Sequence, residues 1–318
     1  MTRFNPQRRH LLQLAAAGVA AATLPLPALA AGSDTLRIGY QKYGTLVLLK
    51  AQGTLEKRLA PLGISVKWAE FPGGPQLLEA LNVGSVDFGT TGETPPIFAQ
   101  AAGADLRYVA YEPPAPRGEG IVVQKDSPIR SVKDLKGKKI ALNKGSNVHY
   151  LLVRALENAG LKYEDVQVVF LNPSDGRAAF ERGSVDAWVI WDPFFAAVEK
   201  QLGARLIADG RGNVSNHQFY LAAGQYAAEN GKVIKLIVEE LARLDKWALQ
   251  NLPEVASQLS SQIGLDKAIV QVAAERGSYG VRGIDAAVLA EQQRIADTFY
   301  QLKLIPKPLA VKDIVWKG

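Results

Sequence analysis

Apolar and polar residues follow one another along the chain in a regular order of strand-like and helix-like segments. Residues 36–40 and 64–68 alternate between apolar and polar positions, as a strand does when one of its faces is buried. Between them, residues 46–59 carry apolar residues at helical spacing, and residues 75–82 do so again before a third strand over 86–90. Strand, helix and strand in this order predict parallel pairing in an open α/β sheet.

The same order continues and then starts again. Thr94 and Pro95 are typical of the first residues of a helix, which we expect to end at Gly103. In residues 146–159 apolar side chains recur at every third or fourth position, which predicts an amphipathic helix ending at Gly160. The other elements expected in this region are strands over 139–142, 166–171, 186–191 and 205–208, and a helix over 174–182.

Two four-residue blocks recur at almost the same offset. Residues 84–87 (GSVD) return at 183–186, 99 residues later, and residues 103–106 (GADL) are echoed at 203–206 (GARL). In each copy we expect the glycine to end a helix in the left-handed conformation and the Val-Asp pair to begin a strand. Glycine-capped turns of this kind are common, but two matched blocks within a matched order of elements favour two related lobes.

After residue 220 the pattern becomes helical, with long amphipathic segments over 232–249 and 284–300. We expect the chain to cross to the second lobe near residues 119–120 and to return near 222–224. The predicted domains are a signal peptide over 1–30, a first lobe formed by 31–119 and 224–318, and a second lobe over 120–223. Two crossings form a hinge, and the cleft between two such lobes is where this architecture places a ligand.

The first 30 residues have the features of an export signal. Arg3, Arg8 and Arg9 precede an apolar stretch of 14 residues, and residues 28–30 (ALA) offer a small-residue cleavage site. The apolar stretch is shorter than the roughly 20 residues that span a bilayer. We therefore expect a cleaved signal peptide and a periplasmic protein, and the pair Arg8-Arg9 leaves both a twin-arginine and an ordinary secretory route open.

The charge of the chain changes meaning once the signal peptide is removed. The full sequence of 318 residues has 37 Lys and Arg against 31 Asp and Glu, a formal charge of +6. Residues 1–30 hold three of the arginines and no acid, so the remaining chain carries only +3. That balance lacks the strong basic stripe of a nucleic-acid binder, and the apolar fraction of 47% fits a globular protein of about two domains.

The residues that most often carry enzyme chemistry are scarce. The chain has no cysteine and only three histidines, His10, His149 and His217, which excludes disulfides, cysteine nucleophiles and histidine-rich metal sites. The glycine-rich phosphate loops, the nucleophile elbow and the zinc-protease motif are also absent. We expect no catalytic residues, no metal ligands, no cofactor and no enzyme activity, with His149 a surface or packed residue.

Two loops at the predicted carboxyl ends of strands are suited to an anion. Thr91-Gly92 follows a strand of the first lobe, and Gly145-Ser146-Asn147 follows a strand of the second. Small and hydroxyl residues bring unpaired backbone N–H groups close to a ligand, and helix dipoles add partial positive charge. We predict that these loops close on one oxyanion from opposite lobes, although Ser146 is also a natural helix cap.

Four further residues have two or more readings each. Trp191 ends an apolar strand, where it forms either a wall over an organic ligand or part of the core. Arg117 lies in a proline-rich crossing and is either a cation at the mouth of the cleft or a solvated surface residue. Glu93 and Asp192 are acids beside the expected anion site, and they could cap helices, accept hydrogen bonds from backbone or Lys42, or face a ligand amine.

Three runs of the sequence carry a family resemblance. Residues 71–87 (FPGGPQLLEALNVGSVD), 91–104 (TGETPPIFAQAAGA) and 185–193 (VDAWVIWDP) are similar to the periplasmic aliphatic-sulfonate-binding proteins of ABC importers. The resemblance covers nearly all of residues 35–318. One difference is Glu93, where the family pattern has the shorter Asp, and this leaves the depth of the pocket open.

The resemblance implies a type II periplasmic binding protein fold, α/β in class, with two lobes joined by a two-crossing hinge. It implies delivery of alkanesulfonates, as a sulfur source, to an ABC permease at the inner membrane. The sulfonate would lie between Thr91-Gly92 and Gly145-Ser146, and Gln41 and Trp191 would line its organic part. The expected ligand-binding residues are Gln41, Thr91, Gly92, Glu93, Gly145, Ser146, Asn147, Trp191 and Asp192.

Two classes of function remain to be compared. The first is a monomeric carrier that closes on an alkanesulfonate and performs no chemistry, with taurine or a small anion such as nitrate as alternative ligands. The second is an enzyme on the same fold, a lyase or a relative of thiamine-pyrimidine synthesis, for which Glu93, Asp192 and His149 are the available acid–base groups.

Overall fold

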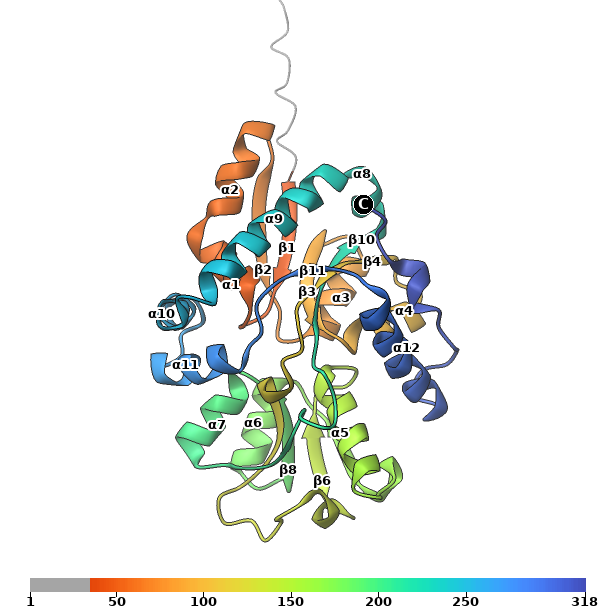
Figure 1. Cartoon of the computed structure of the whole chain (residues 1–318). Coiled ribbons are helices and arrows are strands. Elements are labelled where there is room, and N and C mark those ends of the chain that lie inside the picture. Colours follow the sequence, from red (N-terminus) through yellow and green to blue (C-terminus); the bar gives the residue numbers. More distant parts are fainter. Residues whose placement is uncertain (1–34) are drawn as a thin grey trace, which may run out of the picture. The chain divides into compact units, whose positions relative to one another are not determined.

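The computed structural model describes residues 35–318, and the predicted signal peptide lies outside the described residues. This part of the chain contains two β-sheets, each with helices packed against it (Figure 1). No helix in residues 35–318 has both the length and the apolar composition needed to cross a membrane.

The first sheet has six strands in the order β11-β4-β10-β3-β1-β2. Its strands are β1 (Thr35–Tyr40), β2 (Ser65–Glu70), β3 (Phe88–Gly92), β4 (Leu106–Tyr111), β10 (Gln218–Ala223) and β11 (Arg282–Gly283). Strand β1 pairs in parallel with β2 and β3, as the alternating strand and helix pattern predicts. Strand β10 lies antiparallel between β3 and β4, so the sheet is mixed.

The second sheet has five strands in the order β7-β6-β8-β5-β9. Its strands are β5 (Glu119–Val123), β6 (Lys139–Leu142), β7 (Gln167–Phe170), β8 (Ala187–Trp191) and β9 (Arg205–Asp209). Here β6 pairs in parallel with β7 and β8, while β5 lies antiparallel between β8 and β9. This is the arrangement of the first sheet again, with β5 in the place that β10 takes there.

The structure confirms the internal repeat down to single contacts. All four repeated glycines, at positions 84, 103, 183 and 203, adopt positive φ angles between 63° and 90°. The repeated aspartates are equivalent as well: Asp87 accepts a hydrogen bond from Arg37 N at 2.7 Å, and Asp186 accepts one from Lys139 N at 2.8 Å. Each aspartate therefore joins the start of one strand to its parallel neighbour.

Helices cover both faces of each sheet. Those of the first sheet are α1 (Thr45–Gln52), α2 (Thr54–Leu59), α3 (Gly74–Asn82), α4 (Pro95–Ala101), α8 (Gly224–Glu229), α9 (Gly231–Ala248), α10 (Leu252–Ile263), α11 (Lys267–Arg276) and α12 (Ala286–Gln301). Those of the second sheet are α5 (Asn147–Asn158), α6 (Pro173–Glu181) and α7 (Phe194–Leu202). The C-terminal helices α9, α10 and α12 share apolar clusters with strands of the first sheet.

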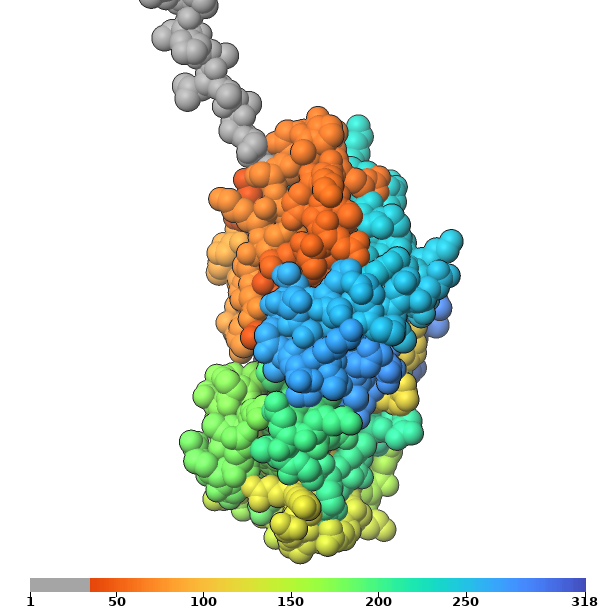
Figure 2. Space-filling view, turned by 90° about the vertical axis from the view of Figure 1, so that its left-hand side faces the viewer, coloured from red at the N-terminus to blue at the C-terminus, as the bar shows by residue number. Residues whose placement is uncertain are grey.

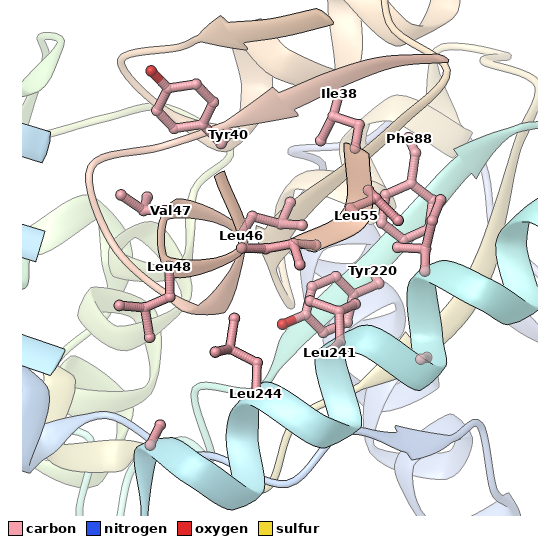
Figure 3. Close-up of a cluster of buried hydrophobic side chains, with 14 of the residues drawn as sticks. Ile38, Tyr40, Leu46, Val47, Leu48, Leu55, Phe88, Tyr220, Leu241 and Leu244 are labelled. Atoms are coloured by element: carbon pink, nitrogen blue, oxygen red, sulfur yellow. The ribbon is translucent and has the colours of Figure 1, made fainter. Parts of the chain in front are cut away.

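The largest apolar cluster lies between the first sheet and helices α1, α2, α9 and α10. Leu46 and Leu48 of α1 face Leu241 and Leu244 of α9, with Tyr220 of β10 alongside (Figure 3). These side chains are fully buried or nearly so. Burial of this kind contributes roughly 25 cal/mol per Å² of apolar surface, which makes the cluster a main source of stability.

Three sequence expectations need correction. The single helix over residues 46–59 is two helices, because Gly53 adopts a left-handed φ of 59° between α1 and α2. The strand expected at 86–90 is β3, two residues later. Thr94 directly precedes α4, but its side chain makes no capping hydrogen bond.

The return crossing also falls earlier than predicted. The chain leaves the first sheet after β4 and enters the second at β5, close to the expected position, but β10 already belongs to the first sheet. The return therefore lies between Asp209 and Gln218 rather than near 222–224. The sequence pattern predicts no strand over residues 218–223, and their apolar residues do not indicate which of two similar sheets would receive one.

Candidate functional site

A pocket of about 100 Å³ lies where the carboxyl ends of strands from both sheets meet. That volume is far above the roughly 10–15 Å³ that one water molecule needs. Of the predicted ligand-binding residues, the pocket wall contains Gln41, Gly92, Ser146, Asn147, Trp191 and Asp192. The fold thus brings together residues from loops that lie up to 151 positions apart in the sequence.

Several helices present their N-termini to this pocket. Gly44 precedes α1, Gly74 begins α3, Ser146 precedes α5 and Pro193 precedes α7, and all four residues line the wall. The helices α1, α3 and α5 have no side-chain capping hydrogen bond at their N-termini, whereas Asp192 Oδ1 accepts one from Ala196 N in the first turn of α7. By contrast, α6, α11 and α12 are capped by Asn172, Asp266 and Asp285. Uncapped N-termini leave backbone N–H donors and dipole charge directed at the space between them.

Asn147 joins the two halves of the pocket. Its Oδ1 accepts a hydrogen bond from Thr94 N at 3.2 Å, and its Nδ2 donates to Asn216 Oδ1. The Asn147 carboxamide also packs directly on Gly92, so that any Cβ at that position would overlap it. Gly92 is therefore required by a close approach between the two sheets, which the sequence analysis did not foresee.

The side chain of Gln41, directly after β1, is fixed by hydrogen bonds to β3 and to its own loop. It is 3% exposed, and its Nε2 donates to Thr90 O and to Tyr43 Oη, both at 3.1 Å. Tyr43 in turn donates to Gln218 Oε1 at 2.8 Å. These bonds fix the polar wall of the pocket through neutral donors and acceptors. Lys42 also lines the wall, 3.7 Å from Glu70 through its Nζ.

Three predicted ligand-binding residues lie outside the pocket wall. Thr91 is fully buried, and its hydroxyl donates to Gly92 O at 3.0 Å. Gly145 adopts a left-handed φ of 70° and faces the ring of Phe98 in a second groove, between α3, α4 and the loops before α5 and α6. Glu93 is 1% exposed and lies behind the pocket.

Ser146 has the backbone position of a helix cap without the side-chain bond. It is the residue before α5, but its hydroxyl donates to Asn143 O at 2.7 Å rather than accepting from the helix. This leaves the first N–H groups of α5 available to another acceptor.

The acids around the pocket are buried, and burial shifts their titration. Glu93 accepts a hydrogen bond from His217 N at 2.9 Å, its other oxygen has no partner, and burial raises its pKa to about 7. Burial likewise raises the pKa of Glu112 to about 8, with the charge of Asp245 adding to the effect. Glu119, at the start of β5, has neither carboxyl oxygen paired, and burial beside Glu93 raises its pKa well above the ordinary value. These groups therefore hold protons in conditions where exposed carboxyls are ionised.

Asp192 lies at the N-terminus of α7 and is shared between the helix and an arginine. Its Oδ1 accepts from Ala196 N at 2.9 Å and lies 3.5 Å from Arg276 Nη1. Burial raises the pKa of Asp192 to about 7 despite that arginine. Trp191, directly before it, lies edge-on to Phe194 and forms part of the pocket wall.

Two other candidate residues, His149 and Arg117, do not line the pocket and make contacts elsewhere in the structure. His149 is fully buried among Phe98, Tyr163 and Phe299, and burial with the nearby Lys144 charge lowers its pKa to about 3. Arg117 is exposed and donates to Glu275 O at 2.8 Å, away from the pocket wall. In residues 35–318 no cluster of three or more His, Asp or Glu side chains is arranged to hold a metal ion.

The sequence analysis missed one whole side of the pocket. That side is formed by residues of α10, α11 and the turn after them, namely Leu259, Ile263, Val270, Ala273, Ala274, Gly277, Ser278 and Tyr279. Apolar residues at helical spacing look the same whether they face a core or a ligand, so the pattern held no signal for them. Glu112 and Asn216, at the two crossings, were missed as well.

The two sheets share one strand order, to which the first sheet adds the edge strand β11, and a pocket lies at their junction. These features define the class of periplasmic binding proteins, which bind a ligand between two α/β lobes. Residues 60–251 match the family described as NMT1/THI5 like. The chain belongs to this family and, within it, to the aliphatic sulfonates-binding proteins.

Relatives of known name support this assignment. A protein of Escherichia coli strain K12 named for aliphatic sulfonate binding is 44% identical over 311 residues, 97% of each chain. A Bacillus subtilis protein of the same name is 33% identical over 282 residues, 88% of this chain and 85% of that one. Among solved structures, the alkanesulfonate-binding protein SsuA from Xanthomonas axonopodis pv. citri bound to MOPS matches with a TM-score of 0.86 and 42% identity. That match covers 91% of this chain and all of the other.

Proposed function

We propose that the protein is the substrate-binding component of an ABC importer and captures aliphatic sulfonates in the periplasm. The observation that carries the proposal is the convergence of the N-termini of α1, α3 and α5, none of which has a side-chain cap, on one pocket. Relatives named for aliphatic sulfonates, and a similar structure bound to the sulfonate MOPS, support the choice of anion.

The pocket chemistry suits a permanently ionised group. A sulfonate keeps its charge at any physiological pH and needs donors rather than a proton acceptor. Backbone N–H groups supply such donors without the desolvation cost of a second buried charge. Glu112 and Asp192 have raised pKa values for the same physical reason, burial, so the acids of the wall oppose an anion less than ionised carboxylates would.

We further propose that the two sheets form two lobes that close on the ligand about the crossings at residues 112–118 and 210–217. In this proposal Asn147 links the two lobes, because its side chain bonds to Thr94 N beside the first sheet and to Asn216 in the second crossing. Within this proposal Gln41, Gly92, Ser146, Asn147 and Trp191 contact the ligand. The protein acts as a monomer, carries no cofactor and passes its ligand unchanged to a permease at the inner membrane.

Calorimetric titration of the purified mature protein tests this function. We expect saturable binding of ethanesulfonate and longer alkanesulfonates, and weaker binding of sulfate and nitrate. At one hundred times its Kd a ligand should stabilise the fold by about 2.7 kcal/mol, which a thermal scan detects. Absence of binding by every sulfonate would contradict the proposal, and recovery of a chemically altered ligand would favour an enzyme.

Export is tested separately. We propose that the signal peptide is cleaved after Ala30, and N-terminal sequencing of the exported protein should then begin at Ala31. A periplasmic protein that begins at Met1 would contradict cleavage.

A further inference from the structure

His149 is a buried histidine to which the proposed function gives no role. It lies in the first turn of α5, next to the loop that carries Ser146 and Asn147, and its side chain is fully buried. Both of its ring nitrogens have a partner. Gly145 N donates to Nδ1 at 3.3 Å, and Nε2 lies 2.7 Å from Tyr163 Oη. The imidazole therefore joins the loop before α5 to the segment that follows this helix.

These two contacts determine where the imidazole of His149 carries its hydrogen. A backbone N–H can only donate, so the hydrogen bond from Gly145 requires an unprotonated Nδ1. The hydrogen of the neutral ring is then on Nε2, which donates it to Tyr163 Oη. Burial, together with the nearby charge of Lys144, lowers the pKa of His149 to about 3, so the ring is neutral at physiological pH. With both nitrogens engaged, the ring has none free for acid–base chemistry.

Aromatic rings hold this imidazole in place from both halves of the molecule. Phe98 of α4 and Phe299 of α12 belong to the first-sheet half, and their ring centroids lie 6.0 and 5.2 Å from that of His149. Phe170, the last residue of β7, lies at 5.5 Å on the second-sheet side. Helix α5 lies below α4 and α12 in Figure 1, whereas α11 meets α7 on the opposite side, where blue meets green in Figure 2. The ring cannot turn away from Gly145 without breaking these contacts.

The bond from Gly145 sets the course of the loop backbone. Gly145 is buried and adopts a left-handed φ of 70°, and without His149 its N–H would lose its acceptor, which is costly in a buried site. Ser146 is tied to the same turn, because its N and its hydroxyl both donate to Asn143 O, at 3.3 and 2.7 Å. A loop that turned Gly145 toward water to find another acceptor would therefore move Ser146 and Asn147 with it.

We propose that His149 is a positioning residue for the bound anion, which holds Ser146, Asn147 and the N-terminus of α5 toward the pocket through its bond with Gly145. This inference rests on the proposed function, in which that loop receives the sulfonate. His149 does not line the pocket, so it acts on the ligand only through the loop. A loop already held in its binding conformation does not have to be ordered by the ligand, and this lowers the Kd.

Two substitutions separate the hydrogen bond from the packing of the ring. His149→Asn keeps an acceptor, since Asn Oδ1 stands at the same place along the side chain as His Nδ1, and His149→Leu keeps an apolar side chain without an acceptor. Both lose the aromatic contacts and the bond to Tyr163. In calorimetric titrations with ethanesulfonate we expect His149→Leu to raise the Kd at least tenfold and His149→Asn to raise it less than threefold.

Tyr163→Phe is the matched control. It removes the partner of Nε2 and keeps the bond from Gly145, so it should change the Kd less than twofold. An unchanged Kd in folded His149→Leu, checked by circular dichroism, would overturn the proposal. Equal losses in His149→Leu and His149→Asn would also overturn it, because they would assign the effect to packing. Failure of the wild-type protein to bind any sulfonate would instead remove the function on which the proposal rests.

The position of the ring hydrogen gives a second test, which needs no variant to fold. Residues 31–318 contain two histidines, His149 and His217, and imidazole ¹⁵N spectra of the wild-type protein distinguish protonated from unprotonated ring nitrogens. We expect His149 to keep an unprotonated Nδ1 and a protonated Nε2 between about pH 5 and about pH 8. A His149 ring that gains a proton near the ordinary pKa of about 6.5, or carries its hydrogen on Nδ1, would contradict the proposal.

Discussion

Single residues decide how closely the two sheets approach one another. Gly92 ends β3, and the Asn147 carboxamide occupies the space that a side chain at position 92 would need. The same carboxamide bonds to Thr94 N and to Asn216. Asn216 itself adopts a positive φ of 54°, unusual for a residue other than glycine, and donates to Ala115 O at 2.9 Å. The contact therefore depends on a small residue in the first sheet and a side-chain amide at the start of α5.

Gly92→Ala should displace the Asn147 side chain and weaken ligand binding at least tenfold, with a loss of stability of about 1–3 kcal/mol from overpacking. Calorimetry and urea unfolding measure the two effects. Gly283→Ala is the control, because no atom lies within 4 Å of a Cβ at that position. Unchanged sulfonate affinity in Gly92→Ala would show that the Asn147 contact is not needed for binding.

Buried acids at the residue scale also predict a dependence of stability on pH. The folded protein keeps protons on Glu93, Asp192 and Glu112 up to pKa values of about 7, 7 and 8, whereas the unfolded chain loses them near 4. Unfolding then releases protons, so the free energy of unfolding should fall as the pH rises from about 4.5 to about 8. Below that range these groups add no slope.

Urea unfolding at several pH values between 4 and 9 measures this slope. Glu112→Gln should flatten it between pH 6 and 8, by at most about 1.4 kcal/mol per pH unit for one proton. The exposed residue Glu254 provides the control, and Glu254→Gln should leave the slope unchanged. A free energy of unfolding that rises with pH over this range would contradict the assignment of protonated carboxyls.

At the scale of elements, the internal repeat offers two versions of one strand contact. Asp87 is 4% exposed and bonds to Arg37 through both its backbone N and, at 2.9 Å, its Nε. Asp186 is exposed and bonds to Lys139 N alone. The two aspartates occupy equivalent positions beside β1 and β6, so they differ mainly in burial and in the added guanidinium.

Asp87→Ala should therefore destabilise the protein more than Asp186→Ala. We expect the free energy of unfolding to fall by about 2–4 kcal/mol in the first variant and by about 1 kcal/mol in the second. A hydrogen-bond donor left unpaired in a buried site costs more than one that water can reach. Chemical denaturation of the two variants gives the comparison directly. Equal losses would mean that burial does not distinguish the two copies.

Elements were also the level at which sequence prediction worked best. The repeat, the parallel strands β1–β3 and β6–β8 and the long helices α5, α9 and α12 follow from periodicity and glycine positions, because each depends on neighbouring residues. The direction of β5 and β10 and the sheet that receives β10 depend on contacts across about a hundred residues. In the site, loop residues such as Gln41 and Asn147 were predictable from strand ends. The side of the pocket formed by α10 and α11 was not, because its apolar residues resemble those of a core.

At the scale of the whole molecule, α11 connects the two sheets and also contacts the first crossing, where Arg117 donates to Glu275 O. It packs on α10 beside the first sheet, and its Arg276 reaches Glu199 and Asp192 in the second-sheet half. Such a contact stabilises the arrangement of the two halves seen here, and any ligand that needs this arrangement gains from it.

Arg276→Ala should consequently speed the dissociation of a bound alkanesulfonate several-fold and have a smaller effect on association. Stopped-flow dissociation measures the change. Arg177→Ala breaks an exposed helical pair with Glu181 and serves as the control, which should have little effect. Equal dissociation rates in the two variants would mean that α11 does not contribute to ligand retention.

A crystal structure of the mature protein with pentanesulfonate tests the central claim most directly. The account predicts the sulfonate oxygens at the N-termini of α1 and α5, near Gln41 and Asn147. A sulfonate group bound elsewhere in the pocket, or a ligand outside the junction of the two sheets, would contradict it.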